Sequence, residues 1–309
     1  MIDLSIIIVS WNVRDLLVDC LDSIQSTVPE TLKIEIIVVD SSSSDNTVDI
    51  LRANYPEIIL ETCTDNVGFS RGNNIGFSIA RGRYLFMLNP DTVVLGDALA
   101  QMVNYLDAHP DVGVVGPRTL NTDGTIQSTR RRFPTVPLAF FESTWLQPYA
   151  PRKMLNRFHV ADVSDEAIAD VDWVQGSALM ARREVYERVG GLDTGYMMFS
   201  EELDWCKRTR LAGWRVVYLG GAQIIHHGGK STEQVAARKH IHFQESKLRY
   251  YYKYHGRGVS ALLRLFLLAS YLWQIVLESV KRGLGSKREM RRERIHAYWQ
   301  VIRSGLKVR

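Results

Sequence analysis

Three short apolar runs, at residues 4–9, 34–39 and 84–88, constrain the fold of this chain more than any other feature. Runs of this length that are rich in Ile, Val and Leu predict strands buried on both faces of a sheet. Stretches with helical periodicity lie at residues 13–26 and 70–81. Because strands that alternate with helices pair in parallel, this order predicts an α/β fold with a mostly parallel central sheet flanked by helices.

The second half of the chain is less regular. Prolines interrupt the periodicity between residues 117 and 170, which predicts loops and short elements that form one wall of a site. A strand is predicted at residues 173–180 and a helix at residues 183–189. Two further strands are predicted at residues 215–219 and 222–226.

Composition and cysteine content indicate a folded protein of a reducing compartment. The chain is 46% apolar and 23% charged, which is ordinary for a globular protein. Cys20, Cys63 and Cys206 are an odd number without metal-ligand spacing, so neither a disulfide framework nor a zinc site is predicted. The first residues lack the pattern of a secretory signal, so we expect them to form the first core strand. We expect the protein to be cytoplasmic.

Polar side chains follow each of the three apolar runs. Ser10 and Asn12 follow the first run, Asp40 follows the second, and Asn89-Pro90-Asp91 follows the third. The carboxyl ends of parallel strands meet at the edge where open α/β folds bind ligands. At this edge Asp40 can accept a hydrogen bond from the imide N–H of a base, or it can belong with the serines after it to a solvated turn.

The Asn89-Pro90-Asp91 turn suits a metal ion. The carboxylate of Asp91, with Asn89 two residues earlier, offers oxygen ligands to a hard divalent cation such as Mg²⁺ or Mn²⁺. One carboxylate binds such an ion weakly. His226 or His227 can supply a further ligand because Mn²⁺ accepts imidazole, although a histidine at a strand end fits a structural role as well.

The segment from Asp65 to Gly76 joins glycines to amides, among them Asn66, and to Arg71 at the start of a predicted helix. Backbone N–H groups at a helix start, together with a guanidinium, suit a phosphate group. A tight turn followed by glycines that allow close helix packing explains the same residues equally well.

Three acids, Glu201, Glu202 and Asp204, lie between Phe199 and Trp205. Burial beside aromatic rings would raise the pKa of a carboxyl group toward that of a useful general base. Acids at the amino terminus of a helix also interact favourably with its dipole, so both roles fit.

The basic character of the chain is concentrated in its tail. Residues 281–309 hold ten Lys or Arg against two Glu, a net +8, and because the whole chain carries +4, the first 280 residues carry −4. The preceding stretch, 262–280, is apolar but has only about 13 uncharged residues in a row where a spanning helix needs roughly 20. The polar residues of this region share one sector of a helical wheel about 120° wide: Ser260, Arg264, Ser270, Gln274, Glu278, Lys281 and Arg282.

This pattern predicts an amphipathic helix that lies in a membrane interface, with the basic tail on an anionic lipid surface. A core helix or a dimerisation helix is the alternative. No nucleic-acid recognition fold accompanies the basic residues, so neither RNA nor DNA is an expected partner.

Two similarities to nucleotide-binding motifs fail on spacing. Gly229-Lys230-Ser231 matches the end of a P-loop, but that motif needs a glycine where Ile224 stands. No G-x-G-x-x-G follows the first strand, which argues against a dinucleotide-dependent dehydrogenase.

Taken in order, several motifs resemble those of family 2 glycosyltransferases with the GT-A fold. They comprise Ser5–Asn12, Val38–Ser41, Asn66–Gly76 and Leu88–Thr92, and the later motifs Gln127–Pro134, Gly176–Ala178, Glu201–Asp204 and His226–Ser231 are similar to those of the rhamnosyltransferase branch. The resemblance covers about residues 3–232. It implies an inverting transfer of a sugar from a nucleoside-diphosphate donor.

The resemblance also implies roles for single residues. Asp40 would bind the base, Asp91 would bind the metal with His226 as the second contact, and Glu202 would be the catalytic base with Glu201 and Asp204 beside it. The remaining donor contacts would come from Ser10, Asn12, Asp65, Asn66, Arg71, Asn89 and Arg131. Trp173, Gln175, Gly176 and Trp205 would line the pocket for the sugar and the acceptor.

On this basis we expect a GT-A domain over residues 1–255, with a nucleotide-sugar half at 1–115 and an acceptor half at 116–255. A membrane-associating extension would occupy residues 256–309. The expected reaction adds L-rhamnose from dTDP-L-rhamnose to a polyprenyl-linked or polysaccharide acceptor, at the inner face of the plasma membrane. A donor such as UDP-galactofuranose, UDP-GlcNAc or another UDP-hexose is the enzymatic alternative, and a non-catalytic sugar-nucleotide-binding scaffold is the non-enzymatic one.

Overall fold

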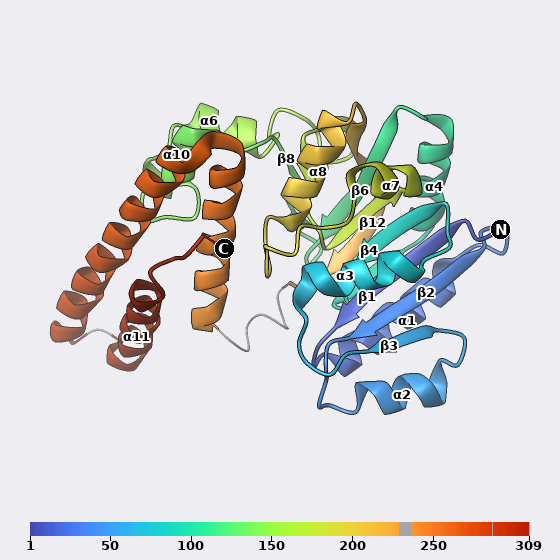
Figure 1. The fold of residues 1–309 in the computed structure, drawn as a ribbon, viewed down its shortest axis with the longest axis horizontal. Helices are drawn as coiled ribbons and strands as arrows, with labels where there is room; N and C mark the ends of the chain where they lie inside the picture. The colour runs from blue at the N-terminus through green and yellow to red at the C-terminus, as the bar shows by residue number, and fades with distance from the viewer. Residues whose placement is uncertain (229–235, 286, 309) are drawn as a thin grey trace. The chain divides into compact units, whose positions relative to one another are not determined.

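The computed structural model describes residues 1–228, 236–285 and 287–308 (Figure 1). The predicted motif residues Gly229, Lys230 and Ser231 lie outside this part of the chain. The chain forms two compact units. Unit 1 comprises residues 1–133, 156–194 and 201–231, and unit 2 comprises residues 134–155, 195–200 and 232–309. The predicted boundary at residue 255 lies inside unit 2, next to Gly256, where α10 (Ala236–Gly283) is interrupted.

Unit 1 is built on a mixed ten-stranded sheet with the order β3-β2-β1-β4-β11-β6-β12-β5, in which β7 pairs with β6 and β9 with β12. The strands are β1 (Leu4–Ser10), β2 (Ile34–Asp40), β3 (Ile59–Thr62), β4 (Tyr84–Leu88), β5 (Thr92–Leu95), β6 (Val112–Leu120), β7 (Ile126–Gln127), β9 (Ile168–Val171), β11 (Ala178–Arg182) and β12 (Arg215–His226). Strands β3, β2, β1 and β4 are parallel to one another, whereas β11 runs antiparallel to β4 and β6. The predicted α/β class and its first three strands are confirmed.

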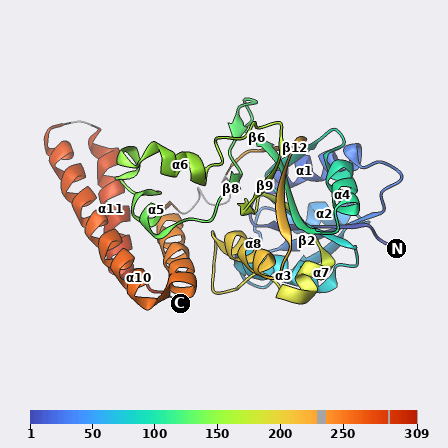
Figure 2. The same ribbon diagram turned by 90° about the horizontal axis from the view of Figure 1, so that it is seen from above.

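Helices cover both faces of this sheet. Their bounds are α1 (Arg14–Thr27), α2 (Thr47–Asn54), α3 (Gly68–Ile79), α4 (Ala98–Ala108), α7 (Arg183–Val189) and α8 (Glu201–Leu211). The short helix α6 (Arg152–Phe158) begins in unit 2 and ends in unit 1. Helices α1, α2 and α4 pack on the face that presents Ile6 and Ile8, and Figure 2 shows α3, α7 and α8 on the other side of the strands. Alternate residues of a strand point to opposite faces, so both faces of β1 are buried.

Helix α3 lies unusually close to β1 because its glycines face the strand. A Cβ atom on Gly76 would lie 2.3 Å from Cγ2 of Ile7, and one on Gly72 would lie 2.7 Å from Cγ1 of Val9. Any side chain at these two positions would displace the helix. Close packing therefore explains two glycines of the Asp65–Gly76 segment without a ligand.

Two strand predictions differ from the structure. The strand predicted at residues 173–180 is broken into β10 (Trp173–Val174), which pairs with β8 (Arg130–Arg131), and β11. The two strands predicted at 215–219 and 222–226 are one strand, β12, whose register shifts between Leu219 and Gln223. At this shift a Cβ atom on Gly220 would lie 2.3 Å from the backbone carbon of Glu166, so glycine permits the close approach of another chain segment.

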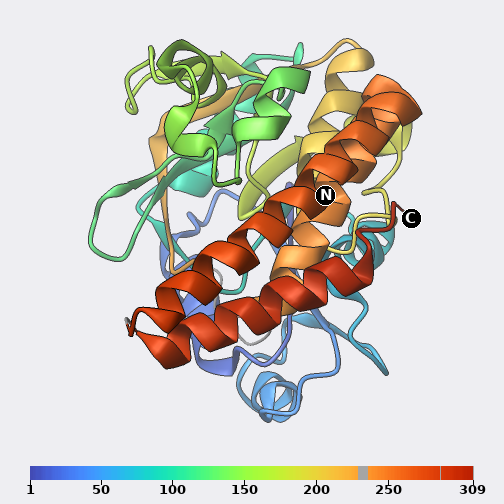
Figure 3. The same cartoon turned by 90° about the vertical axis from the view of Figure 1, so that its left-hand side faces the viewer.

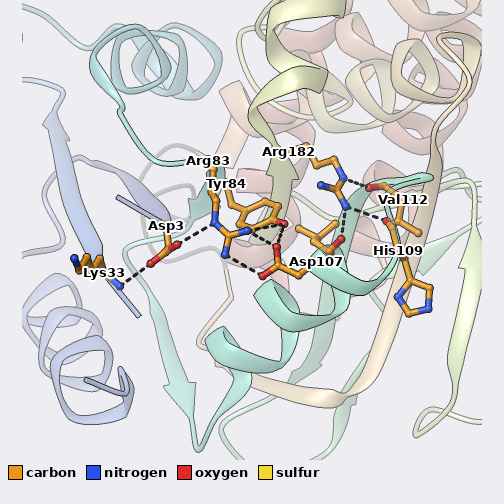
Figure 4. Close-up of polar contacts among 9 residues, drawn as sticks. Asp3, Lys33, Arg83, Tyr84, Asp107, His109, Val112 and Arg182 are labelled. Atoms are coloured by element: carbon orange, nitrogen blue, oxygen red, sulfur yellow. Dashed lines mark hydrogen bonds and ion pairs between the residues drawn. The ribbon is translucent and has the colours of Figure 1, made fainter. Parts of the chain in front are cut away.

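A polar network ties the amino-terminal edge of the sheet together (Figure 4). Nε of Arg83 donates to Asp3 at 2.9 Å, and the other end of its guanidinium forms a pair of contacts with Asp107. The hydroxyl of Tyr84 donates to Asp107 at 2.7 Å. The hydrogen bonds from Arg83 hold the pKa of Asp107 below its ordinary value. This network stabilises the edge opposite to the predicted site.

Unit 2 contains α5 (Val136–Phe141), the 3₁₀ helix η1 (Gln147–Tyr149), α10 (Ala236–Gly283) and α11 (Arg288–Ser304). Helix α10 is interrupted at Gly256, where φ is 86°, and its two segments run in opposite directions (Figures 1 and 3). Nε2 of Gln244 donates to the hydroxyl of Tyr271 at 3.3 Å, which joins the two segments, and the ring of Tyr271 lies 5.5 Å from that of Tyr298 in α11.

Part of the predicted polar face of the C-terminal helix does not face water. Ser260, Ser270 and Glu278 are buried. The hydroxyl of Ser260 donates to the carbonyl oxygen of Leu248, and the carboxylate of Glu278 lies 2.6 Å from Arg291 of α11. These three polar residues can be buried because neighbouring helical segments supply polar partners that the sequence pattern does not reveal.

The apolar side of the same helix is open instead. We define the apolar stripe of α10 as the side chains of Leu262, Leu265, Leu272, Trp273, Val276 and Val280, all of which are exposed. Among the described residues, α10 is the one helix long and apolar enough to cross a membrane by length and composition, and a third of its most apolar window is buried inside the protein.

Candidate active site

The carboxyl edge of the parallel strands brings the predicted site residues together. Ser10 at the end of β1 pairs in register with Asp40 at the end of β2. On the other side of β1, Ile8 pairs with Leu88, the residue before the Asn89–Asp91 turn. The two acidic residues Asp40 and Asp91 therefore follow the strands that flank β1, at one edge of the sheet.

Asp40 combines the two roles considered from the sequence. Its Oδ1 accepts a hydrogen bond from the backbone N–H of Ser43 at 2.9 Å, which stabilises the turn. Its Oδ2 is buried, and within residues 1–228 and the other described ranges it has no hydrogen-bond partner; the same holds for the hydroxyls of Ser10 and Ser41. Buried polar atoms are normally paired, so three such atoms together indicate a place for a polar ligand.

Asn12 connects the ends of β1 and β2. It has a left-handed backbone with φ of 53°, its Oδ1 accepts from the N–H of Ser44 at 2.7 Å, and its own N–H donates to the hydroxyl of Ser43 at 3.0 Å. The side chain of Asn12 thus fixes the loop over the carboxyl edge.

The pairing of β5 with β12 brings a histidine to the Asn89–Asp91 turn. His226 pairs with Thr92, and the N–H of His227 donates to the carbonyl oxygen of Asp91 at 2.9 Å. Nε2 of His226 consequently lies 3.3 Å from Oδ1 of Asp91 and 3.3 Å from Nδ2 of Asn89. It is the ring of His226, as expected, that faces the carboxylate.

A residue without a predicted role, Gln127 of β7, contacts the other side of this imidazole. Its Oε1 lies 2.9 Å from Nδ1 of His226, and its Nε2 donates to the carbonyl oxygen of His226 at 2.7 Å. Apart from the place of Gln127 within a motif, no sequence pattern indicates this contact. No group of three or more His, Cys, Asp or Glu that could hold a metal ion occurs among the described residues, so Asp91 and His226 form a two-residue candidate set.

The loop between β10 and β11 connects this turn to the acids of α8. The N–H of Asn89 donates to the carbonyl oxygen of Ser177 at 2.9 Å. A Cβ atom on the adjacent Gly176 would lie 3.5 Å from Cβ of Glu202 and 3.6 Å from Cε1 of Phe69. Gly176 therefore lies directly against Glu202 and links it to the carboxyl edge.

The two neighbouring glutamates have different environments. Glu202 is half-buried, whereas Glu201 is buried within the protein. Burial, and then the charge of Glu202, raises the pKa of Glu201 well above its ordinary value. Of the two, Glu202 is the one whose side chain is partly exposed.

Two predicted site residues are structural instead. Asp204 is completely buried, and its carboxylate is paired at 2.9 Å with Arg208, so it has no access to substrate. Trp205 is also completely buried; its ring stacks on Phe77, and its Nε1 donates to the carbonyl oxygen of Gly190 at 2.8 Å. These two predictions were wrong because the side chains of Asp204 and Trp205 point into the core, whereas that of Glu202 is partly exposed.

The other residues predicted to contact the donor or the acceptor differ in their local environment. Nε1 of Trp173 donates to the carbonyl oxygen of Arg132 at 3.1 Å. The backbone N–H of Gln175 donates to the carbonyl oxygen of Thr129 at 3.0 Å. Trp173 therefore belongs to the small β8–β10 sheet, and Gln175 directly follows it. The guanidinium of Arg131 donates to the hydroxyl of Ser128 at 2.7 Å.

At the start of α3, Oδ1 of Asn66 accepts from the N–H of Gly68 at 3.0 Å. Asp65, Asn66 and Arg71 are exposed there. Their predicted contacts to the donor stay predictions.

Comparison with known proteins supports one family. The sequence profile of glycosyl transferase family 2 matches residues 5–167. N-acetylglucosaminyl-diphospho-decaprenol L-rhamnosyltransferase of Mycobacterium tuberculosis is 25% identical over 212 residues, which cover 64% of this chain and 68% of that protein. Rhamnosyltransferase WbbL of Escherichia coli is 28% identical over 206 residues, which cover 59% of this chain and 69% of that protein.

Solved structures show the same fold at lower identity. The mannosyltransferase PcManGT from Pyrobaculum calidifontis, solved with GDP-Man and Mn²⁺, aligns with a TM-score of 0.57 and 18% identity over 99% of this chain and 86% of that one. GalNAc-T7, solved with UDP, GalNAc and Mn²⁺, aligns with a TM-score of 0.57 and 14% identity over 81% of this chain and 50% of that one. The chain belongs to glycosyl transferase family 2, has the GT-A fold, and is similar to rhamnosyltransferases.

Proposed function

We propose that this glycosyltransferase transfers L-rhamnose from dTDP-L-rhamnose, with inversion, to a polyprenyl-linked or polysaccharide acceptor of the cell surface. The observation that carries the proposal is the arrangement of Asp40, Asp91 and Glu202 around one edge of the sheet. The names of the two rhamnosyltransferases that the chain resembles support the choice of sugar.

Each residue has one task in the proposed reaction. The unpaired Oδ2 of Asp40 accepts a hydrogen bond from the thymine imide N–H. Glu202 removes the proton from the acceptor hydroxyl, whose oxygen bonds to the anomeric carbon on the face opposite the diphosphate. The bond from that carbon to the diphosphate oxygen breaks, and its electron pair leaves with the diphosphate.

Asp91 and His226 supply a carboxylate oxygen and an imidazole nitrogen 3.3 Å apart, a donor set that fits Mn²⁺ and, with diphosphate oxygens, Mg²⁺. A divalent cation held by these two residues would neutralise charge on the departing diphosphate. Because only two protein groups would hold it, we expect the cation to bind more tightly when dTDP is present.

We further propose that the protein associates peripherally with the inner face of the plasma membrane, where a polyprenyl-linked acceptor would be presented. The apolar stripe of α10 supplies an exposed surface of aliphatic and aromatic side chains. Lys281, Arg282, Lys287 and Arg288 follow it and are exposed, and their charge complements anionic lipid.

A donor panel tests the reaction. Purified protein with Mn²⁺ is given dTDP-L-rhamnose, UDP-galactofuranose, UDP-GlcNAc or UDP-glucose, and donor-induced thermal shifts and nucleotide release are measured. The largest shift and fastest release are expected with dTDP-L-rhamnose. A preference for a UDP-hexose would reject the donor, and the absence of release with every donor and acceptor would favour a non-catalytic scaffold.

A further inference from the structure

We infer that Gln127 is a positioning residue that holds His226 in one tautomer, with hydrogen on Nδ1 and the lone pair of Nε2 directed toward Asp91. The effect on cation binding rests on the proposed function. The effect of Gln127 on the tautomer of His226 does not, because it involves only residues of this chain.

The orientation of the Gln127 amide is determined by its contact with the backbone. Its Nε2 lies 2.7 Å from the carbonyl oxygen of His226, which can only accept a hydrogen bond. If the amide were rotated by half a turn, two oxygen atoms would face each other at this distance. The amide nitrogen must therefore be the atom that donates to the backbone.

The tautomer of the imidazole follows from this orientation. The oxygen atom that remains, Oε1 of Gln127, lies 2.9 Å from Nδ1 of His226 and can only accept. Nδ1 must carry the hydrogen, and in the neutral ring Nε2 then has a free lone pair. Both contacts to Gln127 involve one residue, so the ring and its backbone are fixed together.

The opposite side of the ring shows why this matters. The lone pair of Nε2 lies 3.3 Å from Oδ1 of Asp91, and a carboxylate oxygen also only accepts. In the neutral ring two acceptors at this distance repel each other unless a metal cation or a proton on Nε2 lies between them, or another donor compensates. Nδ2 of Asn89, 3.3 Å from Nε2, is the donor that the structure places there. The pair is therefore arranged so that a cation improves its electrostatics.

Partners that orient a metal-binding histidine typically change metal affinity by 10- to 100-fold when they are removed. We expect Gln127→Met, which keeps the length of the side chain without its hydrogen bonds, to weaken the binding of Mn²⁺ in the presence of dTDP by about 10- to 100-fold. Gln101→Met is the matched control, because Gln101 lies on α4 and its amide donates to Asp97, the residue before that helix, instead of to His226.

The experiment has two readouts. ¹⁵N shifts of labelled histidine, recorded on the metal-free full-length protein and assigned with His226→Asn, report the tautomer; Mn²⁺ electron paramagnetic resonance reports the affinity. The inference predicts an Nδ1–H tautomer in the parent protein and in Gln101→Met, and its loss in Gln127→Met. An Nε2–H tautomer in the parent protein, or an unchanged tautomer in Gln127→Met, would overturn it. If the tautomer behaves as predicted but the parent protein binds no Mn²⁺, the positioning role stands and the metal part of the proposed function fails.

Discussion

Nε2 of His226 and Oδ1 of Asp91 lie 3.3 Å apart at the carboxyl edge of the sheet, although the two residues belong to different segments of unit 1. The antiparallel pairing of β5 with β12 creates this contact, since His226 pairs with Thr92, the residue after Asp91. The turn is fixed internally as well, because the hydroxyl of Thr92 donates to the carbonyl oxygen of Asn89 at 2.7 Å. The geometry of the pair is thus set by backbone pairing before any ligand binds.

Replacement of Asp91 tests the proposed cation site. Asp91→Asn keeps the shape of the side chain but removes its charge. We expect kcat/KM for the donor to fall by at least about 100-fold, because a cation on the leaving group supplies several kcal/mol of transition-state stabilisation. An unaltered circular dichroism spectrum would show that the fold is retained. Turnover equal to that of the parent protein would reject the assignment of Asp91.

The two neighbouring glutamates should respond differently to the same substitution. Glu202→Gln should lower kcat by about 10²- to 10⁴-fold, the range for loss of a general base, with donor affinity unchanged. Glu201→Gln should have little effect on kcat, because Glu201 is buried and its raised pKa favours the uncharged form that glutamine imitates. Steady-state kinetics with separate measurement of donor binding decides the matter; equal losses in both variants would contradict the assignment of Glu202 as the base.

Glu201 should also make stability depend on pH. Its folded pKa is raised, first by burial and then by the charge of Glu202, so the folded state binds the proton more tightly than the unfolded chain. The free energy of unfolding therefore decreases as pH rises from the unfolded pKa toward the folded one. Glu201→Gln should reduce this decrease. Urea unfolding at several pH values between 5 and 8 measures the effect, and parallel curves for the variant and the parent protein would contradict it.

Most of the carboxyl edge was predictable because it depends on local patterns. Apolar runs that end in polar clusters placed Ser10, Asp40 and the Asn89–Asp91 turn on neighbouring strands, as the register confirms. Gln127 was not assigned a role, because a contact between a short strand and a histidine far along the chain leaves no periodic signal.

The errors have a common physical origin in side-chain direction. Asp204 and Trp205 follow Glu202 by two and three residues, but successive residues of a helix point in different directions, and these two face the core. Part of the polar sector of α10 is buried, which the pattern of one helix could not predict because it does not reveal the partners that another helix provides. Arg291 of α11 is such a partner for Glu278.

The network at the amino edge should contribute to stability rather than activity. Asp107→Asn removes the charge that Arg83 contacts, and because both side chains are about two-fifths exposed, we expect a loss of only about 1 kcal/mol at pH 7. The pKa of Asp107 is lowered in the folded state, so its contribution is present above the unfolded pKa and is lost as pH falls through the folded one. Asp162→Asn, at an exposed loop position, is the control.

Urea unfolding at pH 7 and in acid measures this difference. The gap between Asp107→Asn and the parent protein should close in acid. A gap that persists there, or one that the Asp162→Asn control shares, would contradict a role for the charge of Asp107.

The apolar stripe of α10 should determine membrane binding. Replacing Leu265, Trp273 and Val276 together by serine should weaken sedimentation with anionic vesicles by more than about 10-fold, since each buried side chain of this kind contributes about 1.5–3 kcal/mol. All three are exposed, so the substitutions leave the packing between α10 and α11 intact. Leu211→Ser, at an exposed leucine of α8, is the matched control and should bind like the parent protein.

Lipid composition and extraction separate the contributions of charge and insertion. Because Lys and Arg near a surface contribute about 1 kcal/mol each with anionic lipid, vesicles of neutral lipid should bind the parent protein more weakly. An alkaline carbonate wash should release the protein from membranes if the stripe lies in the interface, whereas a helix that crosses the bilayer would resist it. Unchanged vesicle binding by the triple variant would show that another surface contacts the membrane. Resistance to the carbonate wash would contradict peripheral association and indicate that the helix spans the membrane.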